Sequence, residues 1–178
     1  MKMHEKPIAI VQGAPSAVIQ RLFGDLVERW RSEIRIVGML EDGHGPKFKA
    51  RNVGLLRSIV DGRSFPIFQN LGPGAKGCSI DPEGPATAGH AVCCDIKTGC
   101  DLLILSKFGK LETDRQGLTS AFIAGLEAGI PILTSVAPQY VAQWEQFAAP
   151  LFDVLPADRD VIEAWCCGRV ARLLRGTG

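Results

Sequence analysis

The stretch Cys100-Asp101-Leu102-Leu103-Ile104-Leu105-Ser106-Lys107-Phe108-Gly109-Lys110-Leu111-Glu112 contains the strongest fold signal in the sequence. Its first part, 102–105, is a continuous apolar run, which is typical of a central parallel strand covered on both faces. Two lysines, a glycine and a glutamate follow this run closely. Ligands of open α/β sheets bind beyond the carboxyl ends of the strands. The stretch therefore predicts a binding site in this loop, and its lysines favour an anionic ligand.

Strand and helix patterns alternate along the whole chain. The apolar runs predict strands over residues 7–12, 34–40, 101–105, 130–136 and 151–155. Helical spacing predicts helices over residues 17–31, 82–98, 114–128, 138–148 and 158–175. The turn dipeptide Asp61-Gly62 predicts a hairpin between residues 53–60 and 64–69. Such alternation predicts an α/β fold with a mainly parallel sheet, and since no repeat or linker interrupts it, we expect one domain over residues 1–178.

Charge and cysteine spacing limit the classes of partner and cofactor. Twenty Lys and Arg against nineteen Asp and Glu give a formal charge of +1, which argues against a broad nucleic-acid surface. The sequence has neither an apolar run of a membrane span nor a signal-peptide pattern, so we expect a cytoplasmic protein with reduced cysteines. Because the six cysteines lack C-x-x-C spacing, we expect small buried apolar residues and no metal site. A soft-metal or redox role is the alternative.

The loop after the first predicted strand lies where P-loop proteins carry the phosphate-binding motif G-x-x-x-x-G-K-[ST]. Gly13 is present, but Val18 and Ile19 occupy the places of the second glycine and the lysine. Without that lysine and the following hydroxyl, neutralisation of a β/γ-phosphate and anchoring of Mg²⁺ are lost. Backbone N–H groups at the start of the next helix still favour an anion. The candidate ligand-binding residues are Gly13, Ala14, Ser16 and Ala17. The alternative is an ordinary turn with Ser16 as the N-cap.

A second glycine-rich loop covers residues 72–78. It matches G-x-G-x-x-G, although Pro73 does not fit a dinucleotide-binding turn. The lysine in its middle favours contact with an anion. The candidate ligand-binding residues here are Gly72, Gly74, Lys76, Gly77 and Cys78. A loop without a ligand is the alternative.

The loop at residues 106–112 differs from that of a P-loop enzyme, whose Mg²⁺-linked strand ends in Asp or Asp-Glu. This strand ends in Ser106-Lys107, and a cation there repels Mg²⁺ but attracts an uncomplexed oxyanion. We therefore expect Lys107, Gly109 and Lys110 to bind the ligand, with solvated surface lysines as the alternative. Glu112 is a candidate ion-pair partner of a lysine or, if buried, a candidate general base. The sequence supplies no partner nucleophile for it.

Several segments resemble one family in the same order along the chain: residues 72–78, 101–112, 117–118, 128–136 and 144–148. They are similar to the bacterial DUF2478 family, which is related to the THEP1-type nucleoside-triphosphatases. The resemblance covers nearly the whole chain and implies a three-layer αβα sandwich of the P-loop NTPase type with a phosphate or oxyanion site. The family's association with molybdate uptake implies a role with molybdate or tungstate. Where the family has Asn-Arg-Phe-Gly, this chain has Ser106-Lys107-Phe108-Gly109 and keeps a cation.

These observations leave three hypotheses of function. The leading hypothesis is a non-hydrolytic oxyanion-binding protein whose ligand is molybdate, tungstate, phosphate or a phosphate-bearing nucleotide. The alternative is a nucleoside-triphosphatase for ATP or GTP, in which Lys107 or Lys110 replaces the missing loop lysine and Glu112 positions water. A third hypothesis is a structural partner of a transporter or metalloenzyme without a small ligand, and the resemblance implies a link to molybdate uptake or a molybdoenzyme. A homo-oligomer is compatible with each of them.

Overall fold

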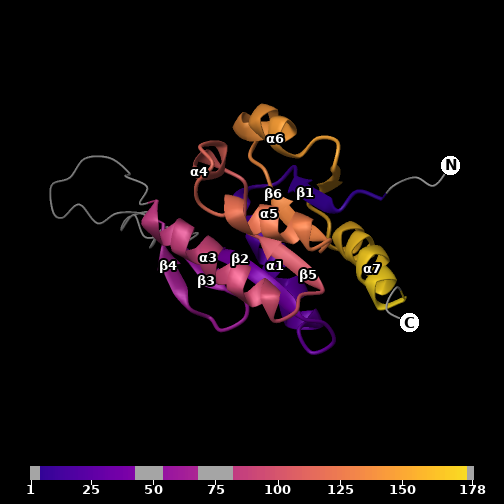
Figure 1. Cartoon of the computed structure of the whole chain (residues 1–178). Coiled ribbons are helices and arrows are strands. Elements are labelled where there is room, and N and C mark those ends of the chain that lie inside the picture. The colour runs from indigo at the N-terminus through magenta and orange to yellow at the C-terminus, as the bar shows by residue number, and fades with distance from the viewer. Residues whose placement is uncertain (1–4, 43–53, 68–81, 176–178) are drawn as a thin grey trace, which may run out of the picture.

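The computed structural model describes residues 5–42, 54–67 and 82–175 (Figure 1). Within these ranges, seven strands form one sheet in the order β4-β3-β2-β5-β6-β1-β7. The strands are β1 (Ile8–Gln12), β2 (Ile36–Asp42), β3 (Leu55–Ser58), β4 (Ser64–Pro66), β5 (Leu102–Leu105), β6 (Ile132–Ser135) and β7 (Phe152–Pro156). All pairs among β2, β5, β6, β1 and β7 are parallel, so the loops after these strands meet at one edge.

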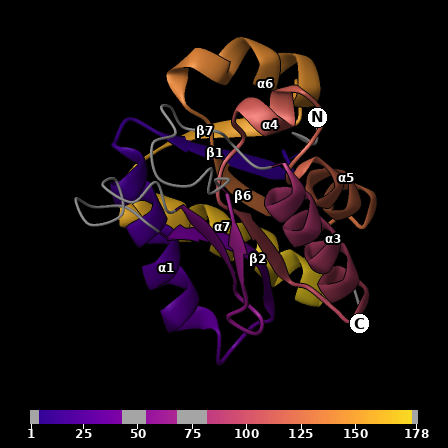
Figure 2. The same cartoon turned by 90° about the vertical axis from the view of Figure 1, so that its left-hand side faces the viewer.

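Helices cover both faces of the sheet. They are α1 (Ser16–Trp30), α3 (Glu83–Lys97), α4 (Lys110–Thr113), α5 (Thr119–Glu127), α6 (Val141–Ala148) and α7 (Arg159–Arg175), with a 3₁₀ turn η1 (Pro138–Tyr140). Figures 1 and 2 show α3 and α5 on the face opposite α1. The predicted three-layer αβα sandwich with a mainly parallel sheet is therefore confirmed.

The apolar strands explain this layering. Successive side chains of a strand point to opposite faces. Ile8 and Ile10 accordingly pack in one core with Phe122 of α5, whereas Ala9 and Val11 pack in the other core with residues of α1 and α7. Because both faces of β1 are apolar, both must be covered, as in parallel sheets generally.

The hairpin predicted around Asp61-Gly62 is confirmed, since β3 pairs antiparallel with β4. The helix predicted from residue 114 is wrong at its start, because α5 begins at Thr119. Before it, Arg115 and Gly117 have φ angles of 59° and 61°, which a continuous helix does not allow. The short α4 occupies part of the preceding segment instead.

Two expectations about side chains need correction. Ser16 is not the N-cap of α1, because the helix begins at Ser16 itself and Pro15 takes the cap position without a side-chain hydrogen bond. The cysteines are not uniformly buried, since Cys166 is buried but Cys94 and Cys167 are exposed. In the described part of the chain, no group of three or more His, Cys, Asp or Glu residues could hold a metal ion.

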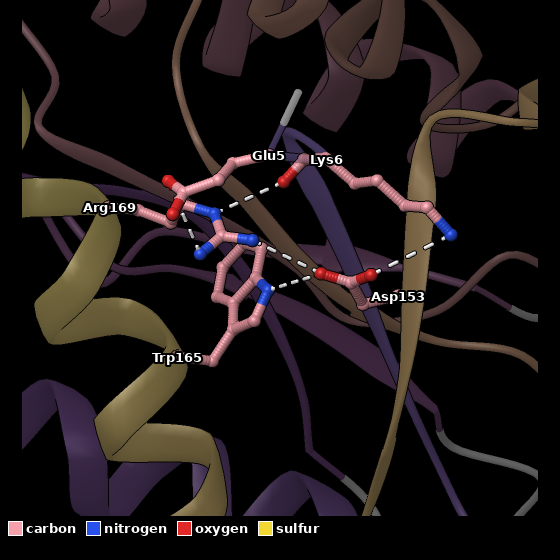
Figure 3. Close-up of polar contacts among 5 residues, drawn as sticks. All are labelled: Glu5, Lys6, Asp153, Trp165 and Arg169. Carbon is pink, nitrogen blue, oxygen red and sulfur yellow. Dashed lines mark hydrogen bonds and ion pairs between the residues drawn. The ribbon is translucent and has the colours of Figure 1, made fainter. Parts of the chain in front are cut away.

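A polar network ties α7 to the edge of the sheet where β1 and β7 begin (Figure 3). Arg169 donates to the carbonyl of Lys6 and to Asp153 Oδ2, both at 3.1 Å, and pairs with Glu5 at 3.7 Å. Trp165 Nε1 donates to the same oxygen of Asp153 at 3.1 Å, and the Arg169 guanidinium lies 4.7 Å from the Trp165 ring centroid. The network stabilises the edge opposite the one where the parallel strands end.

Candidate anion-binding site

A cavity of about 730 Å³ lies at the edge where β1, β5 and β6 end. The loops after these strands line it, together with Glu41 near the end of β2. The short α4, whose first residues belong to this lining, lies in Figure 1 on the side of the sheet away from both chain termini. Residues singled out from the sequence meet in this cavity: Gly13, Ala14, Ser16, Lys107, Gly109, Lys110 and Glu112. Ala17 is not among the lining residues, and residues 72–78 lie outside the described ranges.

The loop after β1 brings the start of α1 to the cavity. Gly13 has a φ of 90°, a conformation that favours glycine, and it turns the chain from the strand into the helix. The N–H groups of Val18 and Ile19 donate to the carbonyl of Pro15, at 2.9 Å and 3.2 Å. The N–H groups of the first helical residues, Ser16 and Ala17, have no acceptor within a helix. This end of a 15-residue helix also carries the positive end of the helix dipole, so the loop favours a negative ligand.

Ser106, at the end of β5, supplies a buried hydroxyl. The residue is 1% exposed and lines the cavity, and its Oγ has no hydrogen-bond partner within the described ranges. Its carbonyl accepts hydrogen bonds from Gln20 Nε2 at 2.8 Å and from Ser135 Oγ at 2.9 Å. A buried polar group without a partner costs free energy, which makes Ser106 Oγ a candidate hydrogen-bonding group of the site.

The two lysines differ in their surroundings. Lys107 Nζ lies 2.7 Å from Glu41 Oε2, and the Glu41 side chain is only 10% exposed. Lys110, in contrast, is exposed at the first position of α4. Lys107 therefore lines the cavity and is paired with a carboxylate of the same cavity, and its contact with a ligand stays a prediction.

Glu112 is buried, and its two carboxylate oxygens accept backbone hydrogen bonds. Oε2 accepts the N–H of Gly109 and Oε1 that of Leu118, each at 2.9 Å. Burial raises the pKa of this carboxyl, although the two hydrogen bonds and the charge of Lys107 act in the opposite direction. These bonds hold together the two ends of the loop that carries α4. They favour a structural role, and a role as general base stays a prediction.

Sequence reasoning missed Gln20, which connects two loops of the site. Gln20 is 6% exposed; its Oε1 accepts the N–H of Glu41 at 3.0 Å, and its Nε2 donates to the Ser106 carbonyl. One side chain of α1 thus fixes the ends of β2 and β5. The available signal was its spacing, because Gln20 shares the buried face of α1 with Phe23 and Val27. Val18, two residues before Gln20, lies outside this buried face and is 40% exposed.

Apolar side chains form one wall of the cavity. They are Leu56 of β3, Ile67 after β4, Pro85 of α3, Leu111 of α4 and Leu118 before α5. The cavity thus combines a polar part, at the ends of β1 and β5, with an apolar wall. Its volume falls within the range of about 300–1,000 Å³ of small-molecule sites.

This arrangement defines an α/β protein with a cavity at the carboxyl edge of its parallel strands. Comparison with known proteins identifies its family and a solved structure of similar fold. The chain belongs to the family described as "Protein of unknown function (DUF2478)", whose model matches residues 8–165. Its fold is similar to the crystal structure of THEP1 from the hyperthermophile Aquifex aeolicus, with a TM-score of 0.60 and 12% identity over 87% of this chain and 92% of that one. Membership of this family is therefore confirmed, and so is the fold expected from the resemblance to THEP1.

One curated relative also matches. The chain is 31% identical over 173 residues to "Molybdenum import ATP-binding protein ModC 2" of Bradyrhizobium diazoefficiens. The match covers 94% of this chain but 19% of the relative, so the chain spans about a fifth of that protein's length. Separately, none of the helices within the described ranges combines the length and apolar character needed to cross a membrane.

Proposed function

We propose that this protein binds an oxyanion on a P-loop-type scaffold without hydrolysing a nucleotide, and that molybdate or tungstate is the ligand. One observation carries the proposal: the start of α1, Ser106 and Lys107 line the same cavity. Amide N–H, hydroxyl and ammonium groups are all hydrogen-bond donors, which a tetrahedral dianion needs on several sides.

The absence of two chemical groups argues for binding without hydrolysis. After β1, Val18 and Ile19 stand in place of the P-loop glycine and lysine, so the lysine that neutralises the charge of a triphosphate is missing. The strand β5 leads into Ser106 and Lys107 rather than into a carboxylate that would bind Mg²⁺. A site with a lysine at this position suits an anion that is not complexed by a divalent metal.

The choice of molybdate or tungstate is supported by the relative described as "Molybdenum import ATP-binding protein ModC 2". The match covers about a fifth of that relative's length. We propose that the present chain handles the same class of anion, as a binding partner of molybdate uptake or of a molybdoenzyme.

Titration calorimetry with molybdate, tungstate, sulfate, phosphate and ATP tests the proposal. Tungstate and molybdate should bind. Lys107→Ala should weaken their binding about tenfold, because it removes one charge-assisted hydrogen bond. The matched control is Lys97→Ala, because Lys97 is an exposed lysine in the last turn of α3, before β5. Absence of heat with every anion would refute the proposal.

A second candidate function is favoured by the size of the cavity. About 730 Å³ with an apolar wall is more space than a bare tetrahedral anion fills, and it suits a nucleotide. In this alternative the protein is a nucleoside-triphosphatase in which Lys107 or Lys110 acts as the phosphate lysine and Glu112 positions water. Phosphate release from ATP or GTP with Mg²⁺, abolished by Lys107→Ala or Lys110→Ala, would support it.

A further inference from the structure

We infer that Glu41 sets the anion affinity of the cavity, because its carboxylate competes with the ligand for Lys107. This inference rests on the proposed function, since it concerns the same cavity. Glu41 would thus determine specificity, although its carboxylate offers no hydrogen-bond donor to an anion.

The strand register brings the two residues together. β2 and β5 are parallel, with Met39 opposite Leu105. Glu41 lies two residues further along β2, and Lys107 lies two residues beyond Leu105, the last residue of β5. The parallel register therefore brings both residues to the same edge of the sheet, where Lys107 Nζ lies 2.7 Å from Glu41 Oε2.

The carboxylate is held in place from the backbone. The N–H of Glu41 donates to Gln20, which also fixes the carbonyl next to Lys107, that of Ser106. With 10% of its side chain exposed, Glu41 has little access to water, so its charge is poorly screened. An anion that enters the cavity meets this fixed negative charge beside the ammonium it needs.

A second carboxylate lies close to the same lysine. Lys107 Cε and Glu112 Oε2 lie 3.9 Å and 3.8 Å from the position that a Cβ on Gly109 would take. The Lys107 side chain therefore lies near two carboxyl groups, those of Glu41 and Glu112. The repulsion between a carboxylate and a ligand grows in proportion to the charge of the ligand. Glu41 should consequently weaken the binding of a dianion more than that of a monoanion of the same shape.

Tungstate and perrhenate are suitable probes, because both are tetrahedral oxyanions but the first is a dianion and the second a monoanion. Their dissociation constants are measured by calorimetry for the wild type, Glu41→Gln and the control Glu127→Gln. Glu127 is an exposed carboxylate at the end of α5, before β6. Glu41→Gln should bind tungstate about tenfold more tightly and perrhenate about threefold more tightly, the latter being half the free-energy gain. The control should match the wild type.

The outcomes separate this inference from the proposed function. If the wild type binds tungstate and Glu41→Gln binds it equally or less tightly, Glu41 does not compete and the inference is overturned. If neither protein binds tungstate, the proposed function fails and the inference fails with it. Should Glu41→Gln not fold, Glu41→Asp provides the same test, since it withdraws the carboxylate from Lys107 by one methylene. It should then give a smaller gain in the same direction, and no gain would overturn the inference.

Discussion

Gly117 lies so close to Glu112 that a Cβ atom on Gly117 would be 2.3 Å from Oε1 of Glu112. The same oxygen accepts the N–H of Leu118, and Gly117 has a φ of 61°. A glycine is therefore required at this position for two reasons: its backbone conformation and the space it leaves for a buried carboxylate.

Gly117→Ala should lower the free energy of unfolding by about 3 kcal/mol, because it adds a steric conflict to backbone strain. Gly129→Ala is the matched control. Gly129 has a φ of 68°, but nothing lies within 4 Å of a Cβ there, so the strain alone should cost about 1 kcal/mol. Urea unfolding of the two variants measures the difference. Equal losses would mean that the loop adapts to the methyl group.

The pH dependence of stability should report the burial of Glu112. Burial raises the pKa of this carboxyl in the folded protein, whereas the unfolded chain has the ordinary value of about 4.3. Between these two pKa values the folded protein binds more protons, so the free energy of unfolding falls as the pH rises through this window. Glu112→Gln should remove this part of the slope in urea unfolding measured from about pH 4 to pH 8. Parallel curves for variant and wild type would contradict it.

Gln20→Leu should destabilise the protein by about 2 kcal/mol, since it leaves the N–H of Glu41 without its acceptor and removes one of two donors from the Ser106 carbonyl. It should also weaken anion binding, because the loops after β2 and β5 lose their common anchor. Urea unfolding and calorimetry with tungstate measure the two effects. A variant with normal stability would show that Gln20 does not hold these strand ends.

The network around Arg169 should contribute to stability but not to binding. Arg169→Ala should lower the free energy of unfolding by about 2 kcal/mol. It removes the guanidinium that pairs with the Asp153 carboxylate and stacks on the Trp165 ring. Arg31→Ala, which breaks an exposed pair with Glu28, should cost at most about 0.5 kcal/mol. Both variants should bind tungstate as the wild type does. Loss of binding in Arg169→Ala would mean that the two edges of the sheet are coupled.

Much of the fold could be predicted because apolar runs and helical spacing are local signals. Leu102–Leu105 is a buried strand, and the hairpin at Asp61-Gly62 forms. The errors have local causes as well. The helix expected from residue 114 starts at Thr119, because the Glu112 carboxylate binds the backbone at Leu118 and the chain must turn at Gly117 first. No periodicity contains that information.

The candidate site could be predicted only in part. The rule that ligands bind at the carboxyl ends of parallel strands predicts that Gly13, Ser16 and Lys107 lie at one edge of the sheet, and all three line the same cavity. The pairing of Lys107 with Glu41 could not be predicted, because it requires that β2 and β5 are adjacent strands and that their register is known. Gln20 was missed for a similar reason, since its partners come from two other segments of the chain.

The most direct test of the account is a crystal of the wild-type protein soaked in tungstate, with the anomalous signal of tungsten used to locate the ion. We predict one strong site in the cavity, with ligand oxygens within hydrogen-bond distance of the Ser16 amide, the Ser106 hydroxyl and the Lys107 ammonium. A strong site elsewhere on the protein with an empty cavity, or no site at all, would contradict the account.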